Sequence, residues 1–254
     1  MNALVAGATG ATGRLLVREL LARGTNVTAV VRDAGRLPDD VRQSDRLRII
    51  EGTLLSVSDA ALSDCVAGCD AFLSCLGHRL TFAGVFGPPR RLVTRTVERV
   101  CRAIESGDPP RPVRCVLMGS AGVRNHDCDE GVSFAQRCVL RLLRAGLPPH
   151  ADNEDAAEWL RAHARDCAPR VQWAPRVQWA PRVEWAVVRP DALIDAPEAT
   201  PYDVFPSPTR SAIFDSGRTS RANVAQFMVD LATADDLWSR WRGQMPVIYD
   251  RSAD

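Results

Sequence analysis

A glycine-rich run near the start of the chain places the tightest limit on the fold. Gly7-Ala8-Thr9-Gly10-Ala11-Thr12-Gly13 follows the apolar segment 2–6, which predicts a short buried strand. Residues 14–21 have helical spacing that stops at Gly24, and 27–31 predict a second, β-rich strand. A strand, a helix and a strand within about 30 residues form a parallel crossover. The opening segment therefore predicts a parallel sheet.

The same alternation of apolar strands and amphipathic helices continues along the chain. Further strands are predicted at 47–50, 70–76, 113–118, 184–189 and 247–249, and further helices at 58–67, 92–104, 132–144, 153–164 and 221–232. Strands separated by helical segments indicate a parallel sheet with helices on both faces. The expected fold class is therefore α/β, a doubly wound parallel sheet of Rossmann type in three layers. Residues 1–254 are expected to form a single domain.

Two segments depart from this alternation. The hexamer Pro-Arg-Val-Gln-Trp-Ala occurs twice in residues 169–180 and recurs at 181–186 with Glu in place of Gln. Proline every six residues prevents a continuous central strand, and three short copies are too few for a solenoid. Residues 169–180 are therefore expected to be a tandem-duplicated insert that forms a loop. Residues 195–220, rich in Pro, Ser and Thr, are expected to form a substrate-side loop region over the carboxyl edge of the sheet.

The glycine run also predicts what the first loop binds. Glycines there allow a tight turn, a close approach of the backbone to a pyrophosphate, and close packing of the helix on the strand. The helix that follows offers unpaired N–H groups and a partial positive charge to phosphates. A glycine turn that binds nothing is the alternative. The residues expected to bind a nicotinamide dinucleotide are Gly7, Thr9, Gly10, Ala11, Thr12, Gly13 and Arg14.

The G-x-x-G-x-x-G spacing resembles that of the extended and atypical members of the short-chain dehydrogenase/reductase superfamily. Later segments resemble that group in the same order along the chain. They are Val31-Arg32-Asp33, Cys75-Leu76-Gly77, Val188-Arg189-Pro190 and residues 219–225. Within the superfamily the chain is most similar to the NmrA-like and biliverdin/flavin reductase-like NAD(P)H-binding proteins. The resemblance implies that Leu76 and Gly77 contact the coenzyme.

The end of the second predicted strand bears on the choice of coenzyme. An acidic side chain there bonds the adenosine ribose of NAD, whereas an arginine favours the 2′-phosphate of NADP. Arg32 occupies this position, and Arg14 and Arg36 can add charge-assisted bonds to a phosphate. Asp33 would present a carboxylate instead if the register shifted by one residue. The sequence therefore favours NADP(H) over NAD(H).

The chain contains no lysine, and all 32 of its basic side chains are arginines. This absence excludes a Schiff base, a P-loop lysine and the Tyr-x-x-x-Lys pair that the superfamily usually uses. The two tyrosines, Tyr202 and Tyr249, have no such partner. An isomerase or epimerase is disfavoured because it would need that tyrosine. Hydride transfer remains available, since the nicotinamide supplies the chemistry and the protein need only orient an acceptor.

Three residues near predicted strand ends are candidates for contact with an acceptor. The resemblance places Ser120 beside the nicotinamide, where its hydroxyl bonds a substrate or the carboxamide, or else caps the next helix. His78 follows Gly77, where ligands gather in open α/β sheets. It can deliver a proton near neutral pH, contact a phosphate, or simply lie in a loop. Asp191 is a further candidate, with a turn-forming role as the alternative.

No metal site is expected. The run His126-Asp127-Cys128-Asp129-Glu130 contains several ligand types, but adjacent residues in one short loop rarely converge on one ion. No second cluster has the spacing of a zinc site. Gly119-Ser120-Ala121-Gly122 only approaches the G-x-S-x-G of a serine hydrolase, so that activity has little support.

Composition limits the expected partners and compartment. The formal net charge is +1, so neither a nucleic acid nor an acidic membrane surface is expected as a partner. No apolar run approaches the ~20 residues of a membrane helix, and the first strand leaves no room for a signal peptide. The eight cysteines include no C-x-x-C pair, which is typical of reduced thiols. A cytoplasmic monomer or small homo-oligomer is expected.

Together these features predict an NADPH-dependent reductase of atypical short-chain type. It would transfer a hydride to a small planar acceptor such as a flavin or a quinone. A non-catalytic NADP(H)-binding redox sensor or assembly factor, which the NmrA-like resemblance permits, is the alternative. The two hypotheses differ in whether the reduced coenzyme is consumed.

Overall fold

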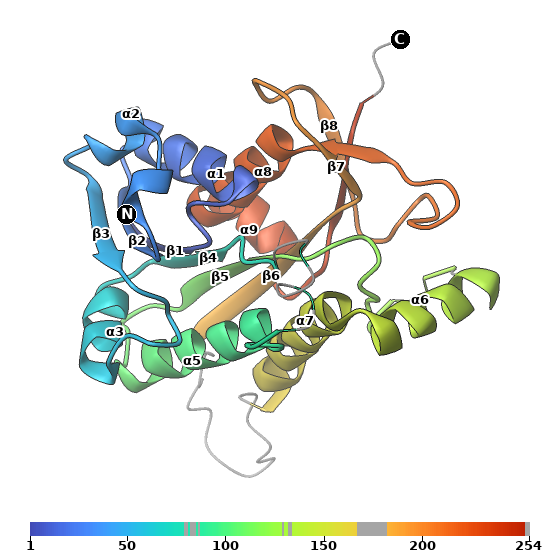
Figure 1. Ribbon diagram of the computed structural model, residues 1–254, viewed down its shortest axis with the longest axis horizontal. Helices are drawn as coiled ribbons and strands as arrows, with labels where there is room; N and C mark the ends of the chain where they lie inside the picture. Colours follow the sequence, from blue (N-terminus) through green and yellow to red (C-terminus); the bar gives the residue numbers. More distant parts are fainter. Residues whose placement is uncertain are drawn as a thin grey trace.

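The computed structural model describes residues 1–78, 81, 85, 87–128, 130–131, 134–166 and 182–251. Within them, one eight-stranded sheet runs through the centre of the protein (Figure 1). Its strands are β1 (Asn2–Ala6), β2 (Asn26–Val31), β3 (Leu47–Glu51), β4 (Ala71–Ser74), β5 (Val113–Met118), β6 (Val183–Pro190), β8 (Tyr202–Phe205) and β10 (Val247–Asp250). Two short strands, β7 (Ala192–Ile194) and β9 (Arg218–Ser220), pair separately.

The strand order is β3-β2-β1-β4-β5-β6-β10-β8. All neighbouring strands are parallel except β8, which runs antiparallel to β10. The order reverses between β1 and β4, because successive strands are added to one side of β1 and then to the other. In such sheets, ligands bind outside the carboxyl ends of the strands at this reversal. The predicted doubly wound parallel sheet is confirmed, and its switch point coincides with the glycine loop.

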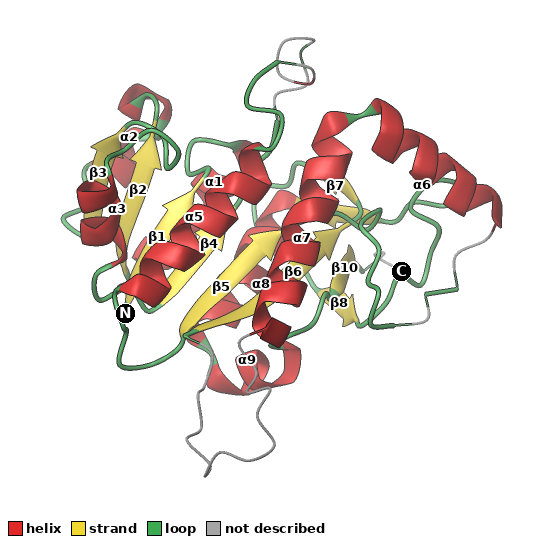
Figure 2. Ribbon diagram, turned by 90° about the horizontal axis from the view of Figure 1, so that it is seen from below, coloured by secondary structure: helices red, strands yellow, loops and turns green. Residues whose placement is uncertain are grey.

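Helices cover both faces of the sheet. They are α1 (Ala11–Ala22), α2 (Asp39–Arg42), α3 (Asp59–Val66), α5 (Leu92–Ser106), α6 (Phe134–Gly146), α7 (Pro148–Asp166), α8 (Arg221–Thr233) and α9 (Asp235–Trp241), with a 3-10 turn η1 at Ala34–Arg36. One apolar core joins the sheet to α1, α8 and α9, and a second joins it to α3, α5 and α7. Figure 2 shows α5 and α7 side by side across the second face. The three predicted layers are therefore present.

Strand β1 shows why its sequence is apolar throughout rather than alternating. Ala3 and Val5 are buried in the core with α1 and α8, whereas Leu4 and Ala6 are buried in the core with α3 and α5. A strand covered on both faces must supply an apolar side chain at every position. This continuous run places the glycine loop at the carboxyl edge of a rigid central strand.

Several boundaries differ from the sequence-based expectation. Helix α7 begins at Pro148 rather than near Asp152, because proline is well tolerated in the first turn of a helix. The structure adds β8 and β9 to the loop region expected at 195–220, and α9 follows the helix expected to be the last. The insert expected at 169–180 lies outside the described residues.

The described cysteines are free thiols. Most pack as small apolar side chains, and burial raises the pKa of the Cys75 thiol to about 12 and that of Cys69 to about 11. A thiol with so high a pKa carries almost no thiolate at neutral pH and is a poor nucleophile. In the same described part of the chain, the search for a helix long and apolar enough to cross a membrane finds none.

Candidate coenzyme and acceptor site

Glycines shape the loop between β1 and α1 at positions where no side chain fits. Gly7 has a positive φ of 79°, and a Cβ there would lie 2.6 Å from the carbonyl oxygen of Cys75. A Cβ on Gly13 would lie 2.1 Å from the carbonyl oxygen of Gly7. Rotating a side chain cannot relieve a clash with backbone atoms. Helix α1 therefore approaches the ends of β1 and β4 this closely only with glycine at both positions.

The first turn of α1 leaves its backbone N–H groups open. Gly10 is the N-cap, and no side chain caps the helix or places an acid in its first turn. The N–H groups of Ala11, Thr12 and Gly13 lack intrahelical acceptors, as the first N–H groups of any α-helix do. Together with the helix dipole they favour a phosphate at this end. The open N–H groups at this end of α1 are chemically suited to a phosphate group.

Arg14 lies in α1, Arg32 directly follows β2, and Arg36 is the last residue of η1. All three are exposed, and none forms an ion pair with another residue in the described part of the chain. Asp33 has a different role, because its Oδ1 accepts the N–H of Gly35 at 3.0 Å and caps the η1 turn. The carboxylate next to Arg32 is therefore engaged in a local turn, while the three guanidinium groups remain available.

The segment after β4 forms the opposite wall of the loop. The Cys75 N–H donates to the carbonyl oxygen of Ala6 at 2.9 Å, which holds this segment beside the glycine loop. The Leu76 nitrogen would lie 2.9 Å from a Cβ on Gly7. Gly7 and Leu76, both expected to contact the coenzyme, are therefore close together. A Cβ on Gly77 would meet nothing within 4 Å, so the chain faces open space there.

His78 is buried and bound to an acid that sequence reasoning did not identify as its partner. Its Nε2 lies 2.8 Å from Oδ2 of Asp152, and the two side chains are only 4% and 0% exposed. Asp152 also accepts the N–H groups of Val93 and Thr94, at 2.8 and 3.0 Å, in the first turn of α5. One carboxylate from α7 therefore caps α5 and fixes the orientation of the histidine.

Ser120 lies half-buried in the turn after β5, and its hydroxyl forms no hydrogen bond with a described residue. A Cβ added at Gly122 would lie 3.7 Å from Oγ of Ser120 and 3.4 Å from Cε1 of His150. Both side chains therefore border the same small space. Nε2 of His150 is buried and has no hydrogen-bond partner among the described residues. It lies 3.6 Å from Oε1 of Glu154, one turn further along α7.

Sequence reasoning missed His150 because it searched for tyrosine and lysine. His150 and Glu154 have the i, i+4 spacing of the usual Tyr-x-x-x-Lys pair, on the helix that precedes β6. The two tyrosines of the chain make contacts with residues other than Ser120 and His150. The Tyr202 hydroxyl donates to Oδ2 of Asp230 at 3.2 Å, and the Tyr249 ring packs 6.0 Å from that of Phe205. Burial raises the pKa of both phenols.

Ala121 and Gly122, which directly follow Ser120, line a cavity of about 370 Å³. Gly122 lines it from the turn after β5, Leu140 from α6, and Thr209 and Arg210 from the loop between β8 and β9. Its size is within the usual range for small-molecule sites. The region expected at 195–220 therefore contributes a wall to a cavity beside the predicted acceptor residue.

Arg189 and Glu130 hold the walls of this region together. Arg189 is fully buried, and its Nη1 donates to Oε1 of Glu130 at 2.6 Å and to the carbonyl oxygen of Val123 at 2.8 Å. Its Nε donates to the carbonyl oxygen of Met245 at 2.7 Å. Val188-Arg189-Pro190, one of the segments that carries the resemblance, thus fixes the loop after β5 against β6 and β10.

Two further acidic residues near the Arg189–Glu130 pair in the sequence, Asp127 and Asp191, also bind other parts of the chain. Asp127 binds Arg161 at 2.7 Å, and the described residues include no group of three or more His, Cys, Asp or Glu placed to hold a metal ion. Asp191 accepts the N–H of Gly217 at 2.8 Å, which fixes the junction between β7 and β9. Burial raises the pKa of the Asp191 carboxyl.

Comparison with known proteins covers most of the chain. Residues 7–235 match the family model described as NAD(P)H-binding. Among curated proteins, 87 residues are 32% identical to the chloroplastic divinyl chlorophyllide a 8-vinyl-reductase of Arabidopsis thaliana, over 31% of this chain and 21% of that protein. A further match of 39 residues is 62% identical to the 3-diazoavenalumate denitrifying reductase of Streptomyces sp, over 15% and 13%. The chain thus spans about a fifth or less of these curated relatives.

Solved structures share the fold over the whole chain. A short-chain dehydrogenase/reductase from Veillonella parvula in complex with NADP has a TM-score of 0.68 at 15% identity, over 99% of this chain and 95% of that one. An anaerobillin reductase from Escherichia coli O157:H7 has 0.66 at 17%, over 100% and 99%. A protein described as a putative NADH-flavin reductase from Streptococcus pneumoniae has 0.64 at 18%, over 99% and 100%. At these identities the likeness shows the fold alone.

Proposed function

Because the chain belongs to the NAD(P)H-binding family, we propose that it is an NADP(H)-dependent reductase of a small planar acceptor such as a flavin or a quinone. The observation that carries the proposal is the glycine loop, in which Gly7 and Gly13 leave no room for side chains beside the open end of α1. The bound coenzyme would supply the hydride. The reductase names of several similar proteins support this choice of reaction.

Coenzyme selection is assigned to the arginines around the loop. Arg32 directly follows β2, the strand that pairs with β1, so its guanidinium starts from the same edge of the sheet as the glycine loop. Arg14 and Arg36 add two further exposed guanidinium groups. Guanidinium groups bind phosphate through paired, charge-assisted hydrogen bonds. Asp33 does not oppose this selection, because its carboxylate caps η1.

Replacing Arg32 with glutamine is expected to weaken NADPH binding about tenfold or more and to leave NADH binding unchanged. The lost group would contact only the 2′-phosphate, which NADH lacks. Calorimetric titration of the purified protein with each coenzyme measures the two dissociation constants. Arg102→Gln is the matched control, since Arg102 is an exposed arginine on α5. Equal losses for the two coenzymes would remove the role assigned to Arg32.

Ser120 and His150 are assigned to the acceptor. The Ser120 hydroxyl forms no hydrogen bond with a described residue, and it lies beside Gly122, which lines the 370 Å³ cavity, so it can bond an acceptor oxygen there. His150 borders the same space, and its imidazole is assigned to supply the proton. His78, which Asp152 orients beside Gly77, is assigned to the coenzyme side. The chain would thus orient the acceptor and supply a proton without the usual Tyr and Lys.

Replacing His150 with glutamine is expected to lower kcat with a quinone about tenfold or more and to leave the NADPH dissociation constant unchanged. The reason is that reduction of a carbonyl oxygen needs a proton, which solvent delivers more slowly than a positioned side chain. His163→Gln on the same helix is the control, since His163 stacks on Trp159 and binds Glu105. An unchanged kcat and an unchanged pH profile would show that His150 has no such role.

The reductase assignment itself is tested by steady-state oxidation of NADPH with a panel of flavins and quinones. The expected result is acceptor-dependent oxidation that is faster with NADPH than with NADH. Tight NADPH binding with no oxidation by any acceptor would contradict the assignment. That outcome would instead favour a non-catalytic NADP(H)-binding sensor or assembly factor.

A further inference from the structure

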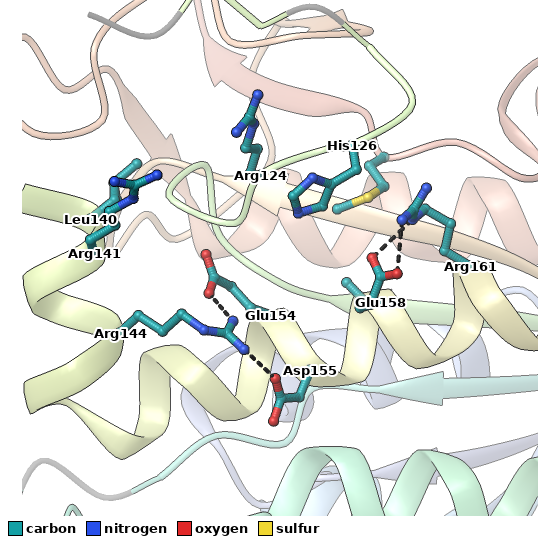
Figure 3. A pocket seen from close by; sticks show the side chains of 11 residues that line it. Arg124, His126, Leu140, Arg141, Arg144, Glu154, Asp155, Glu158 and Arg161 are labelled. Atoms are coloured by element: carbon teal, nitrogen blue, oxygen red, sulfur yellow. Dashed lines mark hydrogen bonds and ion pairs between the residues drawn. The ribbon is translucent and has the colours of Figure 1, made fainter. Parts of the chain in front are cut away.

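A second cavity, of about 410 Å³, lies between α6, α7 and the loop after β5 (Figure 3). It shares two lining residues, Arg124 and Leu140, with the 370 Å³ cavity next to Ser120. The two cavities therefore adjoin along the inner face of α6. A ligand held beside Ser120 has room to extend past Arg124 into the second cavity.

Each acidic side chain that lines the second cavity already has an arginine partner. Arg144 binds both Glu154 and Asp155, the latter at 2.9 Å, and Arg161 binds Glu158 at 2.8 Å (Figure 3). The two Arg144 pairs join α6 to α7, whereas the Arg161–Glu158 pair lies within α7. No described carboxylate of the lining therefore remains without a cationic partner.

Two cationic side chains of the same lining have no such partner. Arg124 and Arg141 form no hydrogen bond or ion pair with any residue that the structure describes, and Figure 3 draws no interaction from either side chain. His126 adds a third basic group to the lining. The lining carries four arginines and three carboxylates, so the two arginines without partners leave it with a net positive charge. A guanidinium group is suited to bind a carboxylate or a phosphate.

The rest of the lining is apolar. Leu140, Ala157 and Met245 supply the side chains between the charged groups. A site with an apolar floor and a few converging polar groups is the usual form of a small-molecule site, where the polar groups fix orientation. The cavity therefore fits the acidic end of an otherwise apolar molecule.

We propose that the acceptor of this protein carries a carboxylate or a phosphate, which Arg124 and Arg141 bind in the second cavity. Its planar, reducible part then lies in the adjoining cavity beside Ser120. This inference rests on the proposed reductase function and narrows its substrate class to anionic acceptors. Neutral planar acceptors would be reduced less efficiently because they leave the two guanidinium groups unused.

Two pairs of acceptors test the proposal, each differing only in the charged group. Flavin mononucleotide and riboflavin share one ring system and differ by a phosphate, and a naphthoquinone carboxylate can be compared with its methyl ester. Dissociation constants are measured in the presence of NADP⁺, so the readout does not depend on turnover. The charged member of at least one pair is expected to bind about tenfold more tightly or better.

The variant Arg124→Gln/Arg141→Gln is expected to abolish that difference without weakening the neutral member. Arg102→Gln, on α5, is expected to preserve it. Equal dissociation constants within both pairs, or a preference that survives in the double variant, would overturn the proposal. Parallel assays of NADPH oxidation report separately on the reductase function. Oxidation with equal preference for charged and neutral acceptors would refute only the anionic substrate class, whereas anion-selective binding without oxidation would refute only the reductase.

Discussion

A Gly13→Ala variant is expected to lose most of its affinity for the coenzyme, by about 100-fold, and to be destabilised by about 1–3 kcal/mol. The added Cβ would lie 2.1 Å from the carbonyl oxygen of Gly7. Helix α1 would have to move away from β1. Its first N–H groups would then no longer lie beside the glycine loop, where the coenzyme phosphates are expected to bind. Calorimetric titration with NADPH and unfolding in denaturant measure the two effects.

Gly146→Ala is the matched control for this substitution. Gly146 ends α6, and a Cβ there would meet nothing within 4 Å. This variant is expected to bind NADPH as the parent protein does and to unfold at the same or a slightly higher denaturant concentration, because alanine favours a helix more than glycine does. Unchanged NADPH binding by Gly13→Ala would show that the coenzyme lies elsewhere than at the glycine loop.

Replacing Arg189 with methionine is expected to destabilise the protein by about 3–5 kcal/mol, because it leaves the buried Glu130 carboxylate without its partner. The same change removes the bonds from Arg189 to the carbonyl oxygens of Val123 and Met245. The loop that carries Ser120 and lines both cavities would then lose its attachment to β6 and β10. Denaturant unfolding measures the free energy change.

Two comparisons separate this effect from a general loss of charge. Arg18→Gln breaks an exposed ion pair with Asp40 and is expected to change stability very little. Adding Glu130→Leu to Arg189→Met removes the unpaired carboxylate and is expected to restore part of the lost stability. If Arg189→Met unfolded at the same denaturant midpoint as the parent protein, the stabilising role of the Arg189–Glu130 pair would be contradicted.

Local sequence patterns predicted the parallel sheet and the glycine loop, whereas the strand order and its switch point came from the structure. The apolar run of β1 and the glycines after it act within a few residues, so periodicity and turn chemistry are enough to identify them. The short elements β8, β9 and α9 were not predicted from the sequence. Strands β8 and β9 lie in a segment rich in turn-forming residues, and α9 directly follows another helix. Their pairing depends on tertiary contacts rather than on local preference.

The polar partners of the site could not be predicted in this way. Asp152 is 74 positions from His78, and Glu130 is 59 positions from Arg189. No periodic pattern links residues so far apart, and each pair forms only when the folded sheet brings its two segments together. The position of His150 beside Ser120 likewise depends on the packing of α7 against the turn after β5.

The central claim is that the glycine loop holds NADPH for hydride transfer to an acceptor in the adjoining cavities. Its most direct test is a single-turnover experiment, in which protein loaded with NADPH is mixed with acceptor and the absorbance of reduced nicotinamide is followed. Decay that depends on the acceptor, slows with NADPH deuterated at the transferred position, and is lost in Gly13→Ala is the predicted result. Persistence of bound NADPH in the presence of every acceptor would contradict it.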